Sequence, residues 1–129
     1  YAGAMSWDAA LMFDSIDPDY AAIAYDLRHF RADSGLSWKT ALATVKKHIR
    51  SIYVKDAIWE GERSNKLKNV PLDTGFVDKE TFDAVRKGHK PMPVSLHMEW
   101  GKTQLYPKED VMEAVEFVAR DVKTLKSWI

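Results

Sequence analysis

Cysteine is absent from this 129-residue sequence, and its absence excludes several classes of protein at once. A chain without cysteine has no disulfide framework, no thiolate metal site and no cysteine nucleophile. Such a composition is compatible with a reducing compartment, and we therefore expect a cytoplasmic protein.

Long apolar runs and an excess of charge of one sign are also missing. No run approaches the roughly 20 apolar residues that a membrane-spanning helix needs. Lysine and arginine together number 19, and so do aspartate and glutamate. Because no net charge would attract polyanions, we expect neither nucleic acid nor a membrane surface as a partner.

The beginning of the sequence lacks the marks of a native start. The first methionine is Met5, and no basic segment leads into an apolar stretch, so we expect no signal peptide. We predict instead that the chain begins inside a longer protein. Apolar residues make up 46% of the chain and aromatic residues 12%, which indicates a folded domain with a core.

What the sequence does contain is an alternation of helical and extended patterns. Apolar residues at spacings of three and four predict four helices, and short extended runs predict three strands between them. The helices begin near Ser6, Ser37, Asp78 and Pro107. The strands are expected at residues 21–26, 51–55 and 94–99, with a polar loop at 60–69. Strands that alternate with helices pair in parallel through right-handed crossovers.

Side chains within each predicted strand divide into two sets. Ile52 and Val54, for example, alternate with Ser51, Tyr53 and Lys55. A doubly wound sheet is covered on both faces and would be apolar throughout. The pattern favours an α/β barrel, with helices on one face and a lumen on the other. Because a complete (β/α)8 barrel needs about 250 residues, we predict that residues 1–129 are the C-terminal part of one.

Polar side chains gather where the predicted strands end, which is where parallel barrels carry their chemistry. Asp26 and His29 follow the first strand in an Asp-x-x-His arrangement. A carboxylate and an imidazole at such a junction can share a metal ion or hold a sugar hydroxyl. The alternative is a capped turn beside a surface histidine.

Lys55 and Asp56 end the second strand, and Trp59 follows them. A lysine at a barrel rim can bind a carbonyl or carboxylate oxygen, and a tryptophan can stack on a sugar ring. The alternative is a Lys-Asp ion pair beside a tryptophan that only packs.

His97 and Glu99 belong to the lumen-facing set of the third strand. A partly buried carboxylate can ligate a metal ion or carry a proton. The alternative is a hydrogen-bond network in the lumen. Two ionisable groups on one buried face are costly unless they are paired, which favours a functional role for both.

Four segments together resemble the sugar phosphate isomerase/epimerase-like group of xylose-isomerase-like barrels. They are the Tyr-Asp-Leu-Arg-His run at 25–29, the Ser-Ile-Tyr-Val-Lys-Asp run at 51–56, the Val-Pro-Leu-Asp-Thr-Gly-Phe-Val-Asp loop at 70–78 and the strand at 93–100. Their order and spacing match that family over almost the whole chain. The resemblance implies strands six, seven and eight of the barrel.

The resemblance also implies a divalent metal, manganese, magnesium, zinc or cobalt, in the parent protein. In the family a Glu, an Asp, a His and a Glu on strands five to eight hold it. Asp26 matches the strand-six ligand and His29 a residue that touches substrate. The sequence departs at Tyr53, where the strand-seven His is expected, and at His97, where the strand-eight Glu falls. Glu99, with His97, is the replacement we expect.

The implied function of the parent is a sugar or sugar-derivative isomerase or epimerase. In it Glu99 and His97 would be catalytic, His29, Lys55 and Trp59 would bind the carbohydrate, and Asp26, Glu99 and His97 would hold the metal. A keto-sugar lyase or dehydratase, using the same proton abstraction, is one alternative. A metal-free, non-catalytic binding barrel is another, and a DNA-repair enzyme of the endonuclease IV type is a distant third.

Two further predictions concern the isolated chain. We expect it to be inactive alone, and to associate with itself through the lateral edges of its sheet, since open strand edges favour association. Asp26 is expected, in the absence of metal, to pair with a neighbouring cation, with Lys55 or His29 ahead of Arg28, because an uncompensated buried carboxylate is costly.

Overall fold

A computed structural model describes residues 5–61, 66–101 and 111–129 of the chain. The helices are α1 (Ser6–Phe13), α2 (Leu27–Ser34), α3 (Trp38–Val45), α4 (Lys79–Arg86) and α5 (Val111–Trp128). The strands are β1 (Ile23–Asp26), β2 (Ile49–Val54), β3 (Asp56–Trp59), β4 (Leu67–Val70) and β5 (Val94–Leu96). The predicted start of the last helix at Pro107 lies outside the described residues.

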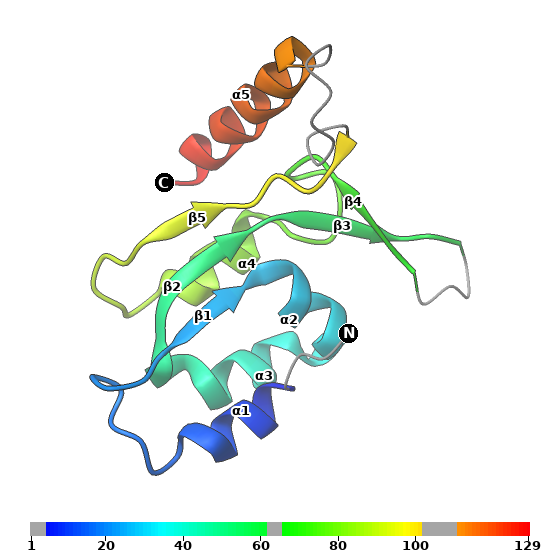
Figure 1. The fold of residues 1–129 in the computed structure, drawn as a ribbon. Coiled ribbons are helices and arrows are strands. Elements are labelled where there is room, and N and C mark those ends of the chain that lie inside the picture. The colour runs from blue at the N-terminus through cyan, green and yellow to red at the C-terminus, as the bar shows by residue number, and fades with distance from the viewer. Residues whose placement is uncertain (1–4, 62–65, 102–110) are drawn as a thin grey trace.

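Strands β1, β2 and β5 form one parallel sheet in chain order, and their arrows point the same way in Figure 1. Asp26 of β1 is level with Tyr53 of β2, which is level with Ser95 of β5. Beyond β5 the ladder continues, because the backbone N–H of His97 donates to the carbonyl of Val54 at 2.9 Å. The predicted set of three parallel neighbouring strands is confirmed.

The two faces of this sheet are buried very differently. Tyr25, Ile52 and Val54 are almost fully buried and share one hydrophobic core with side chains of helices α3 and α4. On the other face Ala24 and Ser95 are exposed. Helices therefore cover one face and leave the other open, as a partial barrel requires and as the alternation of side chains predicts.

The structure adds a short helix and a two-stranded hairpin to the predicted order. Asp26 caps a short helix, α2, by accepting a hydrogen bond from the backbone N–H of His29 at 3.0 Å. Strand β3 lies just before the stretch predicted as a loop and pairs with β4, most of which lies in that stretch, as an antiparallel hairpin. The prediction of a polar loop over the whole of residues 60–69 was therefore wrong, because antiparallel pairing with β3 satisfies the backbone of residues 67–70.

Asp56 ties this hairpin to the loop that follows it. Its buried carboxylate accepts backbone hydrogen bonds from Ala57 at 2.7 Å, Val77 at 2.9 Å, Gly75 at 2.7 Å and Thr74 at 3.1 Å. Burial raises the pKa of Asp56, and the four N–H donors offset that shift only in part. A side chain at Gly75 would put its Cβ 2.5 Å from Asp56 Oδ1, so this position accepts only glycine.

The last helix is held against the same loop by a buried carboxylate. Asp121 of α5 accepts from the backbone N–H of Leu72 at 3.1 Å and from the indole N–H of Trp100 at 2.6 Å.

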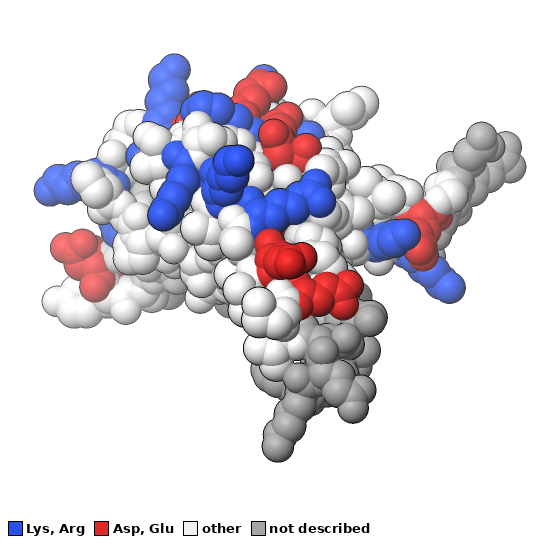
Figure 2. Space-filling view, turned by 90° about the horizontal axis from the view of Figure 1, so that it is seen from above, with Lys and Arg blue, Asp and Glu red and all other residues white. Residues whose placement is uncertain are grey.

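Among the described residues, no helix is both long enough and apolar enough to cross a bilayer. Figure 2 shows basic and acidic side chains lying beside one another on the face seen from above.

Candidate active site at the strand ends

Three charged side chains meet where the three parallel strands end. Asp26 is the last residue of β1, Lys55 directly follows β2, and Glu99 lies three residues beyond β5. Because neighbouring parallel strands end at the same edge of a sheet, these side chains reach a common point. Their convergence is the central feature of the rim.

Lys55 lies between the two carboxylates. Its Nζ is 3.0 Å from Asp26 Oδ2 and 2.8 Å from Glu99 Oε1. The lysine side chain is 7% exposed and that of Asp26 is 11% exposed, so the contacts are screened little by water. The predicted pairing of Asp26 with Lys55 is confirmed.

Glu99 has a second cation. Arg28 Nη1 lies 3.2 Å from Glu99 Oε2. Burial alone would raise the pKa of Glu99, but the hydrogen bond from Lys55 and the charges of Lys55 and Arg28 outweigh it, so this pKa lies below its ordinary value. Glu99 is therefore held ionised at neutral pH.

Asn69 of β4 connects the hairpin to this network. Its side-chain oxygen accepts a hydrogen bond from Arg28 Nη1, and its Nδ2 donates to the backbone carbonyl of Glu99 at 2.8 Å. The sequence does not single out Asn69, because this residue belongs to the stretch predicted as a loop. Arg28, the least favoured of the predicted partners of Asp26, pairs with Glu99 instead.

The ring of His29 lies between Asp26 and Arg28. Its Nε2 is 2.5 Å from Arg28 Nη2, and its Nδ1 is 3.3 Å from Asp26 Oδ2. A guanidinium only donates hydrogen bonds, so Nε2 accepts and Nδ1 carries the proton that faces Asp26. Burial lowers the pKa of His29, and although Asp26 opposes the shift, the charges of Lys55 and Arg28 add to it. The imidazole is thus neutral.

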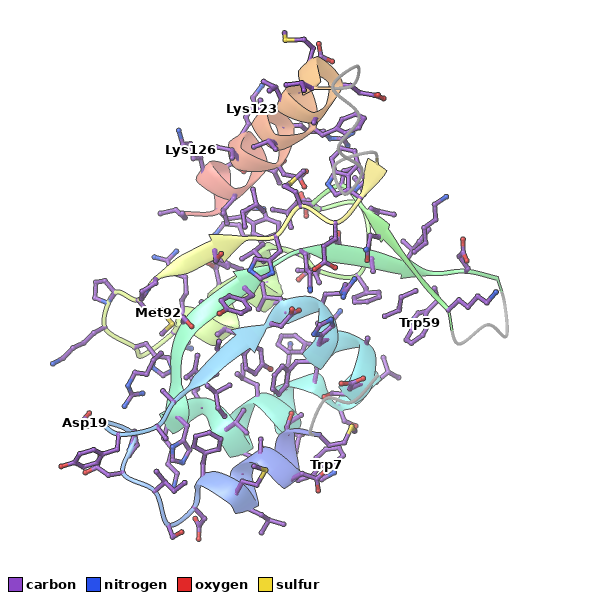
Figure 3. All side chains as sticks on the ribbon, in the orientation of Figure 1. Trp7, Asp19, Trp59, Met92, Lys123 and Lys126 are labelled. Atoms are coloured by element: carbon purple, nitrogen blue, oxygen red, sulfur yellow. The ribbon has the colours of Figure 1, made fainter. Side chains whose placement is uncertain are left out.

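His97 and Trp59 lie outside the ion-pair network. The His97 ring packs against Tyr53 with 4.4 Å between ring centroids, and within the described residues it forms no ion pair with either carboxylate. Trp59 is on β3, 47% exposed, with its ring 6.3 Å from that of Phe76 (Figure 3). The catalytic or ligand role of His97 and the sugar contact of Trp59 stay predictions.

The donor atoms of this rim do not fit a divalent metal. Every carboxylate oxygen of Asp26 and Glu99 already has a hydrogen-bond donor or a cation beside it. In the described part of the chain no group of three or more His, Asp or Glu lies close enough to hold an ion. The predicted metal of the parent protein stays a prediction.

Comparisons with known proteins identify the fold. No protein-family model matches the chain, and no curated protein matches its sequence. A solved xylose isomerase domain protein from Planctomyces limnophilus superposes with a TM-score of 0.71 at 19% identity. The match covers 97% of this chain and 43% of that one, so this chain spans less than half of that protein's length. The xylose-isomerase-like barrel fold is confirmed.

Proposed function

We propose that the protein containing this chain is an isomerase or epimerase of a sugar or sugar derivative, and that residues 1–129 supply part of its active-site rim. The observation that supports this most directly is the convergence of Asp26, Lys55 and Glu99 at three adjacent strand ends. Ligands of parallel barrels bind at that end. The similar fold of a xylose isomerase domain protein agrees with a sugar substrate.

The proposed reaction is a proton transfer beside a carbonyl group. Glu99 takes the proton from the carbon next to the carbonyl, and the electrons of that C–H bond move to the carbonyl oxygen to give an enediolate. Return of the proton to the former carbonyl carbon, with the hydroxyl proton passing to the former carbonyl oxygen, gives the isomer. Return of the proton to the opposite face of the original carbon gives the epimer. No oxidant or reductant is consumed.

The lowered pKa of Glu99 makes this carboxylate a weak base, so the reaction needs a second group that stabilises the enediolate. A weakly basic carboxylate removes such a proton only if the developing negative charge on oxygen is stabilised at the same time. The Lys55 ammonium is 2.8 Å from Glu99 and can provide that stabilisation. We therefore assign Glu99 as the proton carrier and Lys55 as the group that polarises the carbonyl.

His29 and Trp59 have less direct parts in this proposal. Both ring nitrogens of His29 already have partners in the network, so it would contact a substrate oxygen by exchanging one of them. Its present arrangement orients the carboxylate of Asp26. Trp59 is exposed on the hairpin and would stack on a sugar only at the outer margin of the rim.

A metal-free binding barrel is the second candidate. It is favoured by the saturation of both carboxylates by Lys55, Arg28 and His29, which lowers their reactivity. A lyase or dehydratase would share the first proton abstraction and differ only in what the enediolate does next.

Hydrogen exchange of the substrate tests the proposed function. The protein containing this chain is incubated in D2O with aldoses, ketoses and their derivatives, and loss of the C–H signal beside the carbonyl is followed by NMR. Glu99→Gln should slow the exchange by about 100-fold or more, the usual contribution of a positioned acid-base group. Glu116→Gln, on the exposed face of α5, is the matched control and should exchange like the wild type.

Two outcomes would count against the proposal. Exchange that proceeds equally fast in Glu99→Gln removes Glu99 from the reaction. Saturable binding of a carbohydrate without any exchange supports the binding barrel in place of the enzyme.

A further inference from the structure

We propose that the ammonium of Lys55 is the resident cation of this rim, where it serves Asp26 and Glu99 in place of the divalent metal that the family resemblance implies. The identity of the ligand that this cation would bind rests on the proposed function. The place of Lys55 between the two carboxylates does not, and it can be tested without any substrate.

The geometry of the carboxylate oxygens supports this assignment. Lys55 Nζ contacts one oxygen of each carboxylate, at 3.0 Å from Asp26 and 2.8 Å from Glu99. The remaining oxygen of Asp26 accepts from the backbone N–H of His29, and that of Glu99 faces Arg28 at 3.2 Å. A metal would have to displace one of these donors before either carboxylate could ligate it.

The charge balance of the network points the same way. Two carboxylates face two permanent cations, Lys55 and Arg28, so the charges of these four side chains balance without an added ion. The side chains of Lys55 and Arg28 are 7% and 10% exposed. A divalent ion added here would leave two uncompensated positive charges in a poorly solvated place, which is costly.

The usual nitrogen ligands offer no alternative in the described residues. His29 Nε2 accepts from Arg28, and its Nδ1 carries a proton directed at Asp26, so neither nitrogen has a lone pair to give. The ring of His97 packs on Tyr53 and forms no ion pair with either carboxylate in residues 5–61, 66–101 and 111–129. At the position level with Asp26, strand β2 carries Tyr53.

A lysine can perform the electrostatic part of a metal's task. It has three N–H donors, of which two are directed at Asp26 and Glu99, and the third can donate to a carbonyl or hydroxyl oxygen of a ligand. The ligand class is therefore a polar carbonyl compound held by a fixed ammonium. Such a site would keep its function in the presence of a chelator.

Manganese binding by the chain tests the proposal. Mn²⁺ is added to the purified wild-type chain up to ~1 mM, and paramagnetic broadening of the backbone amides near Asp26 and Glu99 is recorded. We expect no saturable broadening there. In Lys55→Met the two carboxylates lose their shared cation, and site-specific binding at least ~10-fold tighter than in the wild type should appear.

The controls separate this effect from a general change of charge. Lys39→Met removes an exposed lysine that pairs with Glu80 and should bind no more Mn²⁺ than the wild type. Lys55→Arg keeps a cation between the carboxylates and should also exclude the ion. If Lys55→Met fails to fold, the wild type and Asp26→Asn decide the question by themselves.

Two results would overturn the proposal. One is wild-type binding of Mn²⁺ that is saturable and disappears in Asp26→Asn. The other is a folded Lys55→Met chain that gains no binding. Neither depends on hydrogen exchange of a substrate, so failure of the proposed function and failure of this inference are distinguishable.

Discussion

Asp56 binds the backbone of the loop at residues 74–77, and Asp56→Asn measures how much these hydrogen bonds contribute to the free energy of unfolding. The wild-type carboxylate accepts four backbone N–H groups, two on each oxygen. Asparagine keeps one oxygen and presents an NH2 group where the other was, so in either orientation two backbone amides face a donor. The substitution changes almost no volume, and its effect is therefore electrostatic.

The expected loss follows from the number of amides left without an acceptor. Asparagine keeps its oxygen toward the buried amides of Ala57 and Val77, so the partly buried amides of Thr74 and Gly75 lose their acceptor. At the lower end of the usual about 1–3 kcal/mol for each unsatisfied N–H, the two together cost about 2 kcal/mol. The whole stability of a domain is about 5–15 kcal/mol. With an m-value of about 2 kcal/mol per molar urea, the unfolding midpoint should fall by about 1 M.

Urea unfolding followed by circular dichroism measures this loss. The matched control is Asp73→Asn, because Asp73 is exposed in the same loop at a positive φ of 67° that asparagine also tolerates. The control should change the free energy of unfolding by less than about 0.5 kcal/mol. A loss below about 1 kcal/mol for Asp56→Asn, at an unchanged m-value, would refute this account of the loop.

The remaining predictions concern pH and association. Burial, with Lys55 and Arg28, lowers the pKa of His29 below 6.5, so the folded chain binds fewer protons than the unfolded chain between the two values. The stability that His29 contributes is then complete above pH 6.5 and is lost as the pH falls through the pKa of His29 in the folded chain. The difference in unfolding free energy between the wild type and His29→Gln should therefore shrink from about pH 8 to about pH 5. A difference that stays constant over this range would contradict the prediction. The outer edges of β1 and β5 have no partner strand within the described residues, and open strand edges favour association. Light scattering of the isolated chain should therefore give a mass above that of a monomer. A monomeric mass at every concentration would disprove this prediction.

The sequence predicted those parts of the site that depend on strand direction. Asp26 and Lys55 end neighbouring strands of known polarity, and their ion pair follows from parallel pairing and from the cost of an uncompensated carboxylate. Glu99 could be placed at the rim for the same reason, although β5 ends at Leu96.

The rest depends on contacts between segments that strand polarity does not determine. Asn69 reaches Glu99 only because β4 folds back on β3, and the polar residues of that stretch carry no alternation that predicts a hairpin. The ring of His97 could have faced Glu99 or Tyr53, and the choice of Tyr53 is a matter of local packing. Arg28 was visible as a cation, but its direction toward Glu99 follows from helix α2.

The ion pairs of Asp26, Lys55 and Glu99 also affect the register in which the parallel strands pair. One residue of each of three separate segments must arrive at a single point for Lys55 to compensate both Asp26 and Glu99. A slip of β2 by one residue would turn Lys55 toward the helix layer and bring Val54 or Asp56 to its place, because side chains alternate between the two faces of a strand. Either exchange would remove the cation that Asp26 and Glu99 share and leave Arg28 alone to compensate Glu99. The ion pairs therefore penalise misaligned sheets during folding, independently of any ligand that the rim binds.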